Sequence, residues 1–317
     1  MAWAGGNSQE LEDFVARLRS SVEEALANGD KLPWRKPWIN NVLNFDTGEG
    51  YSPLNTMWLS IAARANGWKS PFWAGHSQIQ KHKIDPKKYA GATKGQHGTI
   101  ILAPVPRIIE NDEGEKIKII RGFREVRVFN FEQLINVQIP EKLIRKVDEK
   151  VYPEWNEVQN AWLTRPSIRI GGNRASYSPT FDEIHMPEAW QFDSVQEKEA
   201  TLAHEYIHST GHEKRLKRSG IIKPTFFGTD EYAEEELIAE VGAAMLMAAC
   251  GVEQDPAVDE NHTAYLLNWI RRTKAKDLYN AFTYAGKATE YILNGGVVKK
   301  FDSVIVTENE DAEISKV

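Results

Sequence analysis

The segment His204-Glu205-Tyr206-Ile207-His208 constrains the fold more strongly than any other part of the sequence. On an α-helix, two histidines four positions apart lie about 40° apart around the axis, so both imidazoles leave the same face and can share one tetrahedral metal ion. Glu205 lies beside them, within reach of a water molecule on that ion. The pattern therefore predicts a helix that supplies two metal ligands and a carboxylate general base.

Such a metal site needs a third ligand, and a glutamate-rich segment downstream offers one. Residues 232–249 have a helical pattern, and small alanines among them would let this helix pack closely against the histidine helix. We expect Glu236 to be the third ligand. Glu240, one turn further on the same face, is expected to accept a hydrogen bond from Nδ1 of a ligating histidine. Glu235 is the alternative ligand.

A different ligand set is conceivable, because the motif continues as H-E-x-x-H-x-x-G up to Gly211, as in metzincins. The third histidine of that pattern would fall at Lys214, and His212 stands two positions short of it, which favours the glutamate ligand. His212 has two possible roles: it could donate to an oxyanion in the transition state, or it could bond to the carbonyl groups at the end of the helix. In the simplest alternative, the histidines are ordinary surface groups and the glutamates only solvate a helix face.

The composition indicates a folded chain of about two domains. Its 317 residues exceed the usual size of one domain, and 41% of them are apolar. No apolar run approaches the roughly 18 residues that cross a bilayer, and the first 29 residues lack the pattern of a secretory signal. The single cysteine, Cys250, excludes an intrachain disulfide and a thiolate-rich metal site. We therefore expect a cytoplasmic protein with no membrane partner.

Charge is divided unevenly between the two halves of the chain. Residues 1–150 contain 22 Lys and Arg against 18 Asp and Glu, whereas the remaining residues contain 17 against 27. Residues 31–109 contain 11 basic and only 3 acidic side chains, together with five of the ten tryptophans. A basic, tryptophan-rich segment of this kind predicts a surface for a polyanion.

The interleaving of aromatic and basic residues favours single-stranded nucleic acid as that polyanion. Proteins bind single strands with a basic groove along the phosphates and with aromatic faces on which unpaired bases stack. No helix-turn-helix, zinc-finger or basic-zipper pattern is visible. Trp34 and Trp38, in an irregular loop, are the best stacking candidates. The full set of expected contacts is Trp34, Arg35, Lys36, Trp38, Tyr51, Asn55, Trp73, Lys81 and Lys94.

Hydrophobic periodicity predicts an α+β fold. An amphipathic helix is expected to begin the chain and to end before Gly29, and the remaining helices are expected at residues 55–65, 140–166, 194–210, 232–249 and 263–293. Strands are expected at residues 99–105, 124–129, 168–170 and 183–186. Residues 301–317 are acidic and aperiodic, which predicts a mobile tail.

Taken together, the motifs resemble those of the ArdC-type antirestriction proteins of conjugative plasmids and related mobile elements. The resemblance covers nearly the whole chain, and the order of its blocks is more specific than any single block. The blocks are residues 33–38, 51–55, 94–99, 128–130 with Gln133, 171–175, 184–187, 203–212 and 235–240.

This resemblance implies an N-terminal single-stranded-DNA-binding domain, assigned to residues 1–140, and a zincin-like metallopeptidase domain, assigned to residues 141–300. It implies a protein that shields incoming DNA from host restriction, carries one Zn²⁺ per chain and cleaves an unidentified protein substrate. The alternative function is a non-enzymatic protein that coats single-stranded DNA and whose metal site is structural or vestigial.

Overall fold

The computed structural model describes residues 8–27, 42–82, 98–110, 116–134, 154–192, 194–223, 230–252, 270–271 and 273–298. The strands are β1 (Leu43–Asn44), β2 (Phe72–Gly75), β3 (Thr99–Glu110), β4 (Lys116–Asn130), β5 (Ser167–Ile170), β6 (Ser176–Ser178) and β7 (Glu183–Met186). The α-helices are α1 (Gln9–Ala27), α2 (Pro53–Ala65), α3 (His76–Lys81), α5 (Trp155–Ala161), α6 (Val195–Thr210), α7 (Ser219–Ile222), α8 (Asp230–Ala249) and α10 (Ala275–Leu293).

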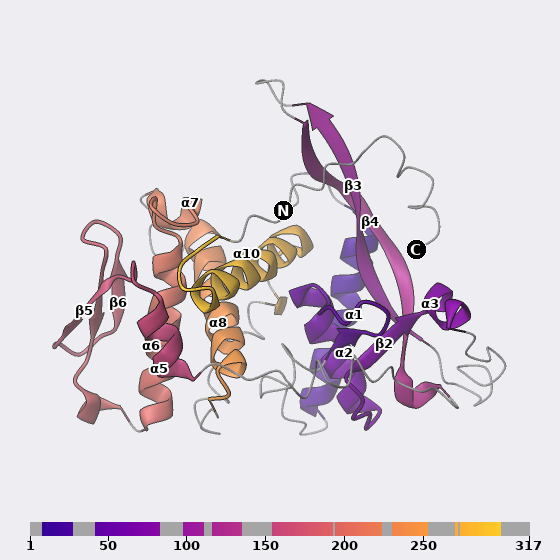
Figure 1. The fold of residues 1–317 in the computed structure, drawn as a ribbon, viewed down its shortest axis with the longest axis horizontal. Coiled ribbons are helices and arrows are strands. Elements are labelled where there is room, and N and C mark those ends of the chain that lie inside the picture. Colours follow the sequence, from indigo (N-terminus) through magenta and orange to yellow (C-terminus); the bar gives the residue numbers. More distant parts are fainter. Residues whose placement is uncertain are drawn as a thin grey trace.

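The N-terminal half is built around a four-stranded sheet with the order β1-β2-β4-β3. Strands β3 and β4 form a long antiparallel ribbon that extends beyond the helices around it (Figure 1). The register of this ribbon shifts at Val105 and Pro106. Strand β2 is covered on both faces, because Phe72 and Ala74 belong to one buried cluster and Trp73 to another.

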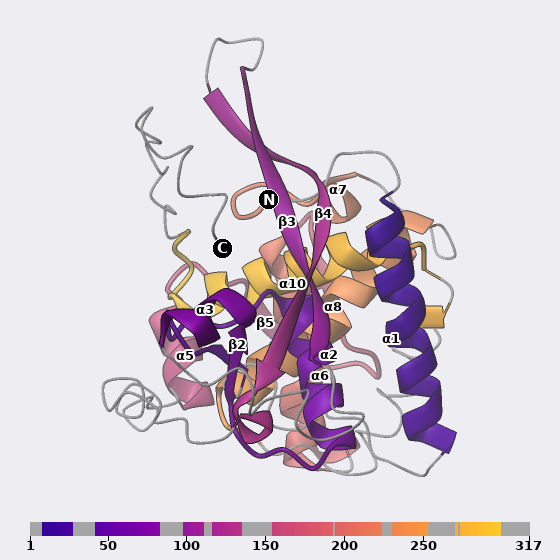
Figure 2. The ribbon, with the colours of Figure 1, turned by 90° about the vertical axis from the view of Figure 1, so that its right-hand side faces the viewer.

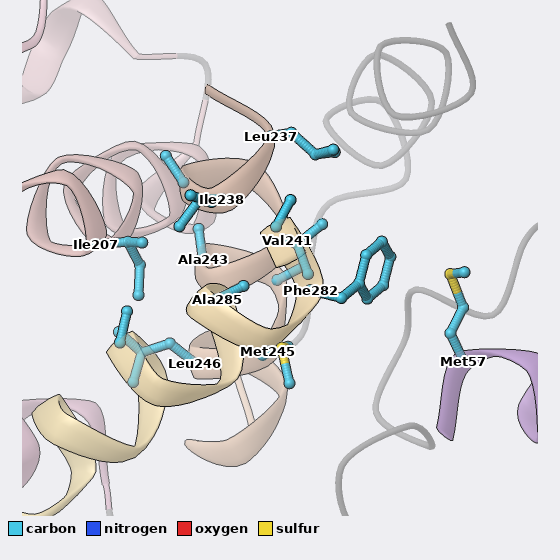
Figure 3. Close-up of a cluster of buried hydrophobic side chains, with 14 of the residues drawn as sticks. Met57, Ile207, Leu237, Ile238, Val241, Ala243, Met245, Leu246, Phe282 and Ala285 are labelled. Atoms are coloured by element: carbon cyan, nitrogen blue, oxygen red, sulfur yellow. The ribbon is translucent and has the colours of Figure 1, made fainter. Parts of the chain in front are cut away.

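The C-terminal half contains a smaller sheet with the order β5-β7-β6, which lies beside α6 (Figure 1). Helices α6, α8 and α10 pack together, and α7 lies against α8. Their buried faces are rich in alanine and branched residues, which lets the helix axes approach closely. Figure 3 shows part of this packing, with Ile207 of α6 among Ala243 and Leu246 of α8 and Ala285 of α10.

The two halves share one hydrophobic core. The apolar stripe of α1, which includes Leu11, Phe14 and Leu18, belongs to the same buried cluster as Phe282 of α10. Figure 2 shows α1 standing beside α10 and the β3–β4 ribbon. The Arg19 side chain of α1 adds a polar contact, because it donates hydrogen bonds to two backbone carbonyls that precede α10.

The structure confirms the α+β class and most expected elements, but several of those elements have different bounds. The helix expected at residues 140–166 is described only from residue 154, and there α5 ends at Ala161 because the backbone of Trp162 leaves the helical region. The ribbon strands extend further than expected, because cross-strand pairing continues into a segment whose own pattern is weak. The helix expected at residues 263–293 is interrupted, since Lys274 has extended backbone angles and α10 begins at Ala275. The carbonyls of Ile270 and Thr273 accept hydrogen bonds from Arg19, which ties the residues before α10 to α1.

Three expected features lie outside the described residues: the helical pattern of residues 140–153, the first part of the helix at 263–293, and the acidic tail at 301–317. None of the helices in the described ranges combines the length and the apolar character that crossing a bilayer requires.

Candidate metal centre

The candidate metal centre lies where α6 and α8 pack against each other. Ser194 begins α6 by accepting a hydrogen bond from the backbone N–H of Glu197, and the helix ends at Gly211. On α8, a Cβ atom added to Gly242 would lie 2.9 Å from Cδ1 and Cγ2 of Ile207, so glycine is needed for the observed approach of the two helices. Because Ile207 stands between the two histidines in the sequence, this close packing fixes the distance between the histidines and the glutamates of α8.

His204, His208 and Glu236 point their side-chain atoms at one place. The two Nε2 atoms are 3.0 Å apart, and Glu236 oxygens lie 3.7 Å from His204 Nε2 and 3.5 Å from His208 Nε2. Four ligands at about 2.0–2.1 Å in a tetrahedron lie roughly 3.3 Å from one another. The three donor atoms therefore fit a tetrahedral ion, with one position left for water or substrate.

The other ring nitrogen of each histidine faces a different carboxylate of α8. His204 Nδ1 lies 3.4 Å from an oxygen of Glu240, and His208 Nδ1 lies 3.3 Å from an oxygen of Glu235. A carboxylate at Nδ1 sets the tautomer that leaves Nε2 free to bind a metal, and it orients the ring. Glu240 thus lies where the sequence predicts it. Glu235 faces Nδ1 of His208 and not Nε2, which favours Glu236 over Glu235 as the ligand.

Arg218 is a buried part of the site that the sequence analysis did not identify. Its guanidinium donates to both oxygens of Glu235, at 3.0 Å from Nε and 2.6 Å from Nη2. It also donates to Thr210 Oγ1 at 2.6 Å and to the carbonyl of Ile207 at 2.7 Å, near the end of α6. Arg218 therefore connects the histidine helix to the carboxylate that orients His208. It could not be found from sequence spacing, because it lies in the loop before α7.

The electrostatic environment of the site favours a cation. Burial opposes protonation of His208, but the carboxylates of Glu235 and Glu236 outweigh it and raise the pKa of the imidazole to about 10. Burial also opposes ionisation of Glu236, yet His208 and His204 hold the pKa of its carboxyl below the usual value. The carboxylates that stabilise an imidazolium would stabilise a bound divalent ion in the same way.

Glu205 and His212 line the cleft that opens over the metal centre. The cleft has a volume of about 860 Å³ and is bounded by β6, the β6–β7 turn, α6, α7 and the start of α8. Both side chains are 7% exposed. The backbone N–H of Lys214 donates to Nδ1 of His212, so that atom is an acceptor and the proton of the neutral ring is on Nε2. His212 is thus not bonded to helix-terminal carbonyls through Nδ1, and the oxyanion role stays a prediction.

Two of the residues expected to contact DNA have structural roles instead. Trp73 is fully buried in the core of the N-terminal half, where it packs edge-on against Trp68, so no base can stack on it. The Asn55 side chain donates to the carbonyl of Leu102 at 2.8 Å and accepts from its N–H at 3.1 Å, which pairs α2 with β3. The expectation of DNA contacts at Trp73 and Asn55 is therefore corrected, because Trp73 is fully buried and the buried amide of Asn55 is bonded to the backbone of Leu102.

The structure describes two of the other expected DNA contacts, Tyr51 and Lys81. Tyr51 is half-buried and its hydroxyl donates to the carbonyl of Trp73 at 3.3 Å. Lys81 is exposed and forms an ion pair with Asp46 at 3.0 Å. The remaining expected contacts, Trp34, Arg35, Lys36, Trp38 and Lys94, lie outside the described residues.

Each half of the chain matches the model of a known protein family. A family model described as the N-terminal domain of the anti-restriction factor ArdC matches residues 12–129. A second model, described as a zincin-like metallopeptidase, matches residues 159–286, a range that includes all of α6 and α8. The fold and the site therefore define a protein in which an ArdC-type N-terminal domain precedes a zincin-like metallopeptidase domain.

Two solved structures are similar to nearly the whole chain. The metal-free and Mn(II)-bound structures of the antirestriction protein ArdC from plasmid R388 match with TM-scores of 0.63 and 0.64, each at 28% identity. The matches cover 91% and 90% of this chain and 98% of each solved chain. This chain thus has the domain arrangement of the ArdC-type antirestriction proteins, as the resemblance of its motifs predicted.

Curated relatives contain a similar sequence, some in longer proteins and one in a protein of similar size. Two DNA primases TraC of Escherichia coli are 30% and 29% identical over 88% and 90% of this chain. The chain spans only 27% and 20% of their lengths. The uncharacterized protein y4eC of Sinorhizobium fredii is 28% identical over 89% of this chain and 91% of its own length.

Proposed function

We propose that this chain is an antirestriction protein that combines a zinc peptidase site with single-stranded-DNA binding, and that it acts in the cytoplasm on DNA entering with a mobile element. The observation that carries the peptidase part is the convergence of His204, His208 and Glu236 beside Glu205 in an open cleft. We assign one divalent ion per chain to these three ligands. Zinc suits two imidazoles and one carboxylate, although the related ArdC structure contains Mn(II).

Each of the three glutamates Glu205, Glu235 and Glu240 has a separate role in the proposed peptidase reaction. When bound, a divalent cation supplies Lewis acidity to the reaction. Glu205 accepts the proton of the attacking water and then delivers it to the leaving amine, as a general base that becomes a general acid. Glu240 and Glu235 keep the histidine rings in place during this proton transfer.

The DNA-binding part rests on the N-terminal half. It is supported by the match to the ArdC N-terminal domain and by the basic, tryptophan-rich composition of residues 31–109. It is also supported by Arg107, Arg121 and Arg127, which are exposed along the β3–β4 ribbon. Neutralising backbone phosphates makes such binding steeply dependent on salt. Affinity for a labelled single strand should therefore fall as salt is added, and equal affinity for single and double strands would contradict the proposal.

The test of the peptidase part is Glu205→Gln. This change removes the general base but none of the three ligands, so we expect cleavage of an unfolded protein to fall at least about 100-fold while metal content stays near one ion per chain. Glu157→Gln is the matched control, since Glu157 is exposed on α5. Loss of metal in Glu205→Gln would identify Glu205 as a ligand. If protection of incoming DNA survives the change undiminished, the protein protects DNA by coating it.

A further inference from the structure

Two large apolar side chains stand exposed at the mouth of the metal cleft. Phe181, in the turn between β6 and β7, is 78% exposed, and Ile222, at the end of α7, is 48% exposed. Both residues line the cleft that contains His204 and Glu205. Exposed apolar side chains are common singly, but two of them from separate elements around one cleft form a surface that an apolar ligand group would cover.

The turn that presents Phe181 is held firmly by polar contacts. The next residue, Asp182, has φ +51°, a left-handed conformation that aspartate tolerates better than most residues. Its carboxylate accepts hydrogen bonds from Arg215 at 2.7 and 3.0 Å and from the hydroxyl of Tyr177 at 2.9 Å. The Arg215 side chain is only 3% exposed. The position of Phe181 is thus determined by a largely buried ion pair.

The helix that presents Ile222 is equally constrained. A Cβ atom on Gly211 would lie 2.5 Å from Cγ1 of Ile221, and one on Gly220 would lie 3.1 Å from Cβ of Glu235. Helix α7 therefore packs tightly on the end of α6 and on the start of α8. The β6–β7 turn is tied to α6, because Arg215 also donates to the carbonyl of Ser209, and α7 packs on α6 and α8. The backbones that present Phe181 and Ile222 are therefore held to the two helices that carry the metal centre.

The rim of the cleft adds an excess of positive charge. Arg174, Lys214 and Lys223 are exposed and line the cleft, and none of them forms an ion pair with another residue that the structure describes. Among the carboxylates of the cleft, Asp182 and Glu235 are paired with arginines, and Glu205 and Glu236 belong to the metal centre. Glu213 is the exposed carboxylate that remains in this lining.

We propose that the cleft selects peptide segments in which a bulky apolar residue is flanked by acidic residues. This inference rests on the proposed peptidase function and names its substrate class. The apolar side chain contacts Phe181 and Ile222, and the flanking carboxylates lie near Arg174, Lys214 and Lys223. Such a segment would be exposed in an unfolded or loosely packed acidic protein, whereas a basic segment would be repelled.

Four quenched fluorescent peptides test the selection. Their central residue is Leu or Ser, and their flanks are either Glu or Lys. The metal-loaded full chain should cleave the Leu peptide with Glu flanks with the highest kcat/KM, about 10-fold or more above each of the others. Phe181→Ala should lower kcat/KM about 10-fold for the two Leu peptides and leave the Ser peptides nearly unchanged. The matched control is Trp190→Ala, because Trp190 is 81% exposed but does not line the cleft.

Charge reversal tests the basic rim separately. In Lys214→Glu/Lys223→Glu, the preference between Glu-flanked and Lys-flanked peptides should reverse. Binding of the same peptides to the Glu205→Gln variant, followed by fluorescence anisotropy, gives a readout that does not depend on cleavage.

The outcomes distinguish this inference from the proposed function. Selective binding to Glu205→Gln, combined with no cleavage of any peptide or unfolded protein by the metal-loaded chain, would support the inferred selection and contradict the peptidase function. Cleavage of all four peptides at similar rates would support the peptidase and overturn the inference. The inference also fails if Phe181→Ala lowers the rates for Leu and Ser peptides alike.

Discussion

Replacing Arg218 by Met should weaken metal binding, although Arg218 is not a ligand. The change keeps much of the apolar length of the side chain but removes the guanidinium that binds both oxygens of Glu235. The two side chains are 4% and 6% exposed, so the carboxylate would stay buried with its arginine partner gone and with His208 still facing it. Without Arg218, burial opposes the ionisation of Glu235 more strongly, so its pKa rises and its carboxyl group orients the ring of His208 less firmly.

The expected magnitude follows from these contacts. Removing one partner of a buried ion pair costs about 3–5 kcal/mol of folding free energy. Losing the carboxylate that orients a ligating histidine lowers metal affinity about 10- to 100-fold. Denaturant unfolding should therefore show a clear loss of stability, and competition with a zinc-binding dye should show the fall in affinity. Because both partners are gone in Arg218→Met/Glu235→Gln, this double variant should recover part of the lost stability.

The matched control is Arg215→Met. Arg215 is as deeply buried as Arg218 and forms an ion pair with Asp182, but that pair holds the β6–β7 turn and contacts neither ligating histidine side chain. Arg215→Met should lower stability and change metal affinity less than about 3-fold. The reasoning is refuted if Arg218→Met binds metal as tightly as the wild type, or if both arginine variants lose affinity equally.

Three further predictions follow from the packing and the site. Gly242→Ala should reduce metal affinity and lower stability by about 1–3 kcal/mol, measured by dye competition and denaturant unfolding, because the added methyl group forces Ile207 and α6 away from α8; unchanged affinity would contradict this. Trp73→Ala should destabilise the fold by about 3–5 kcal/mol in denaturant unfolding, whereas Trp34→Ala/Trp38→Ala should weaken binding of a labelled single strand without loss of stability. Zinc at 100 times its dissociation constant should add about 2.7 kcal/mol to the stability of the chelator-treated protein, measured by thermal unfolding, and none to Glu236→Gln.

The hydrophobic core that the two halves share bears on the predicted domain boundary at residue 140. Helix α1 belongs to the N-terminal half by sequence, yet its apolar face packs in the same cluster as α10. A Cβ atom on Gly286 of α10 would lie 2.8 Å from Cγ of Pro53 at the start of α2, which shows how closely the halves meet. The boundary at residue 140 stays a prediction, and cutting the chain there would expose apolar surface on both pieces.

Much of the metal centre could be predicted because its information is local. Histidines at i and i+4 share a helix face whatever the rest of the fold does, and glutamates at i and i+4 do the same on a second helix. Helix-forming residues around His204 and Glu236 predict the two helices, and the alanines beside Glu236 predict that the helices pack closely. The α+β class followed in the same way from alternating and helical patterns.

What the sequence alone could not decide depends on contacts between distant segments. Whether Glu235 or Glu236 faces the histidines depends on the rotation of α8 against α6, which is set by the contact of Gly242 with Ile207. Arg218 and the burial of Trp73 depend on which loop and which sheet face are covered. An exposed tryptophan beside basic residues and a buried one have the same local sequence pattern, because burial is a property of what packs above the strand. The sequence by itself determined the candidate ligand types and the helices that carry them, and only the tertiary structure decided which side chains converge and which are buried.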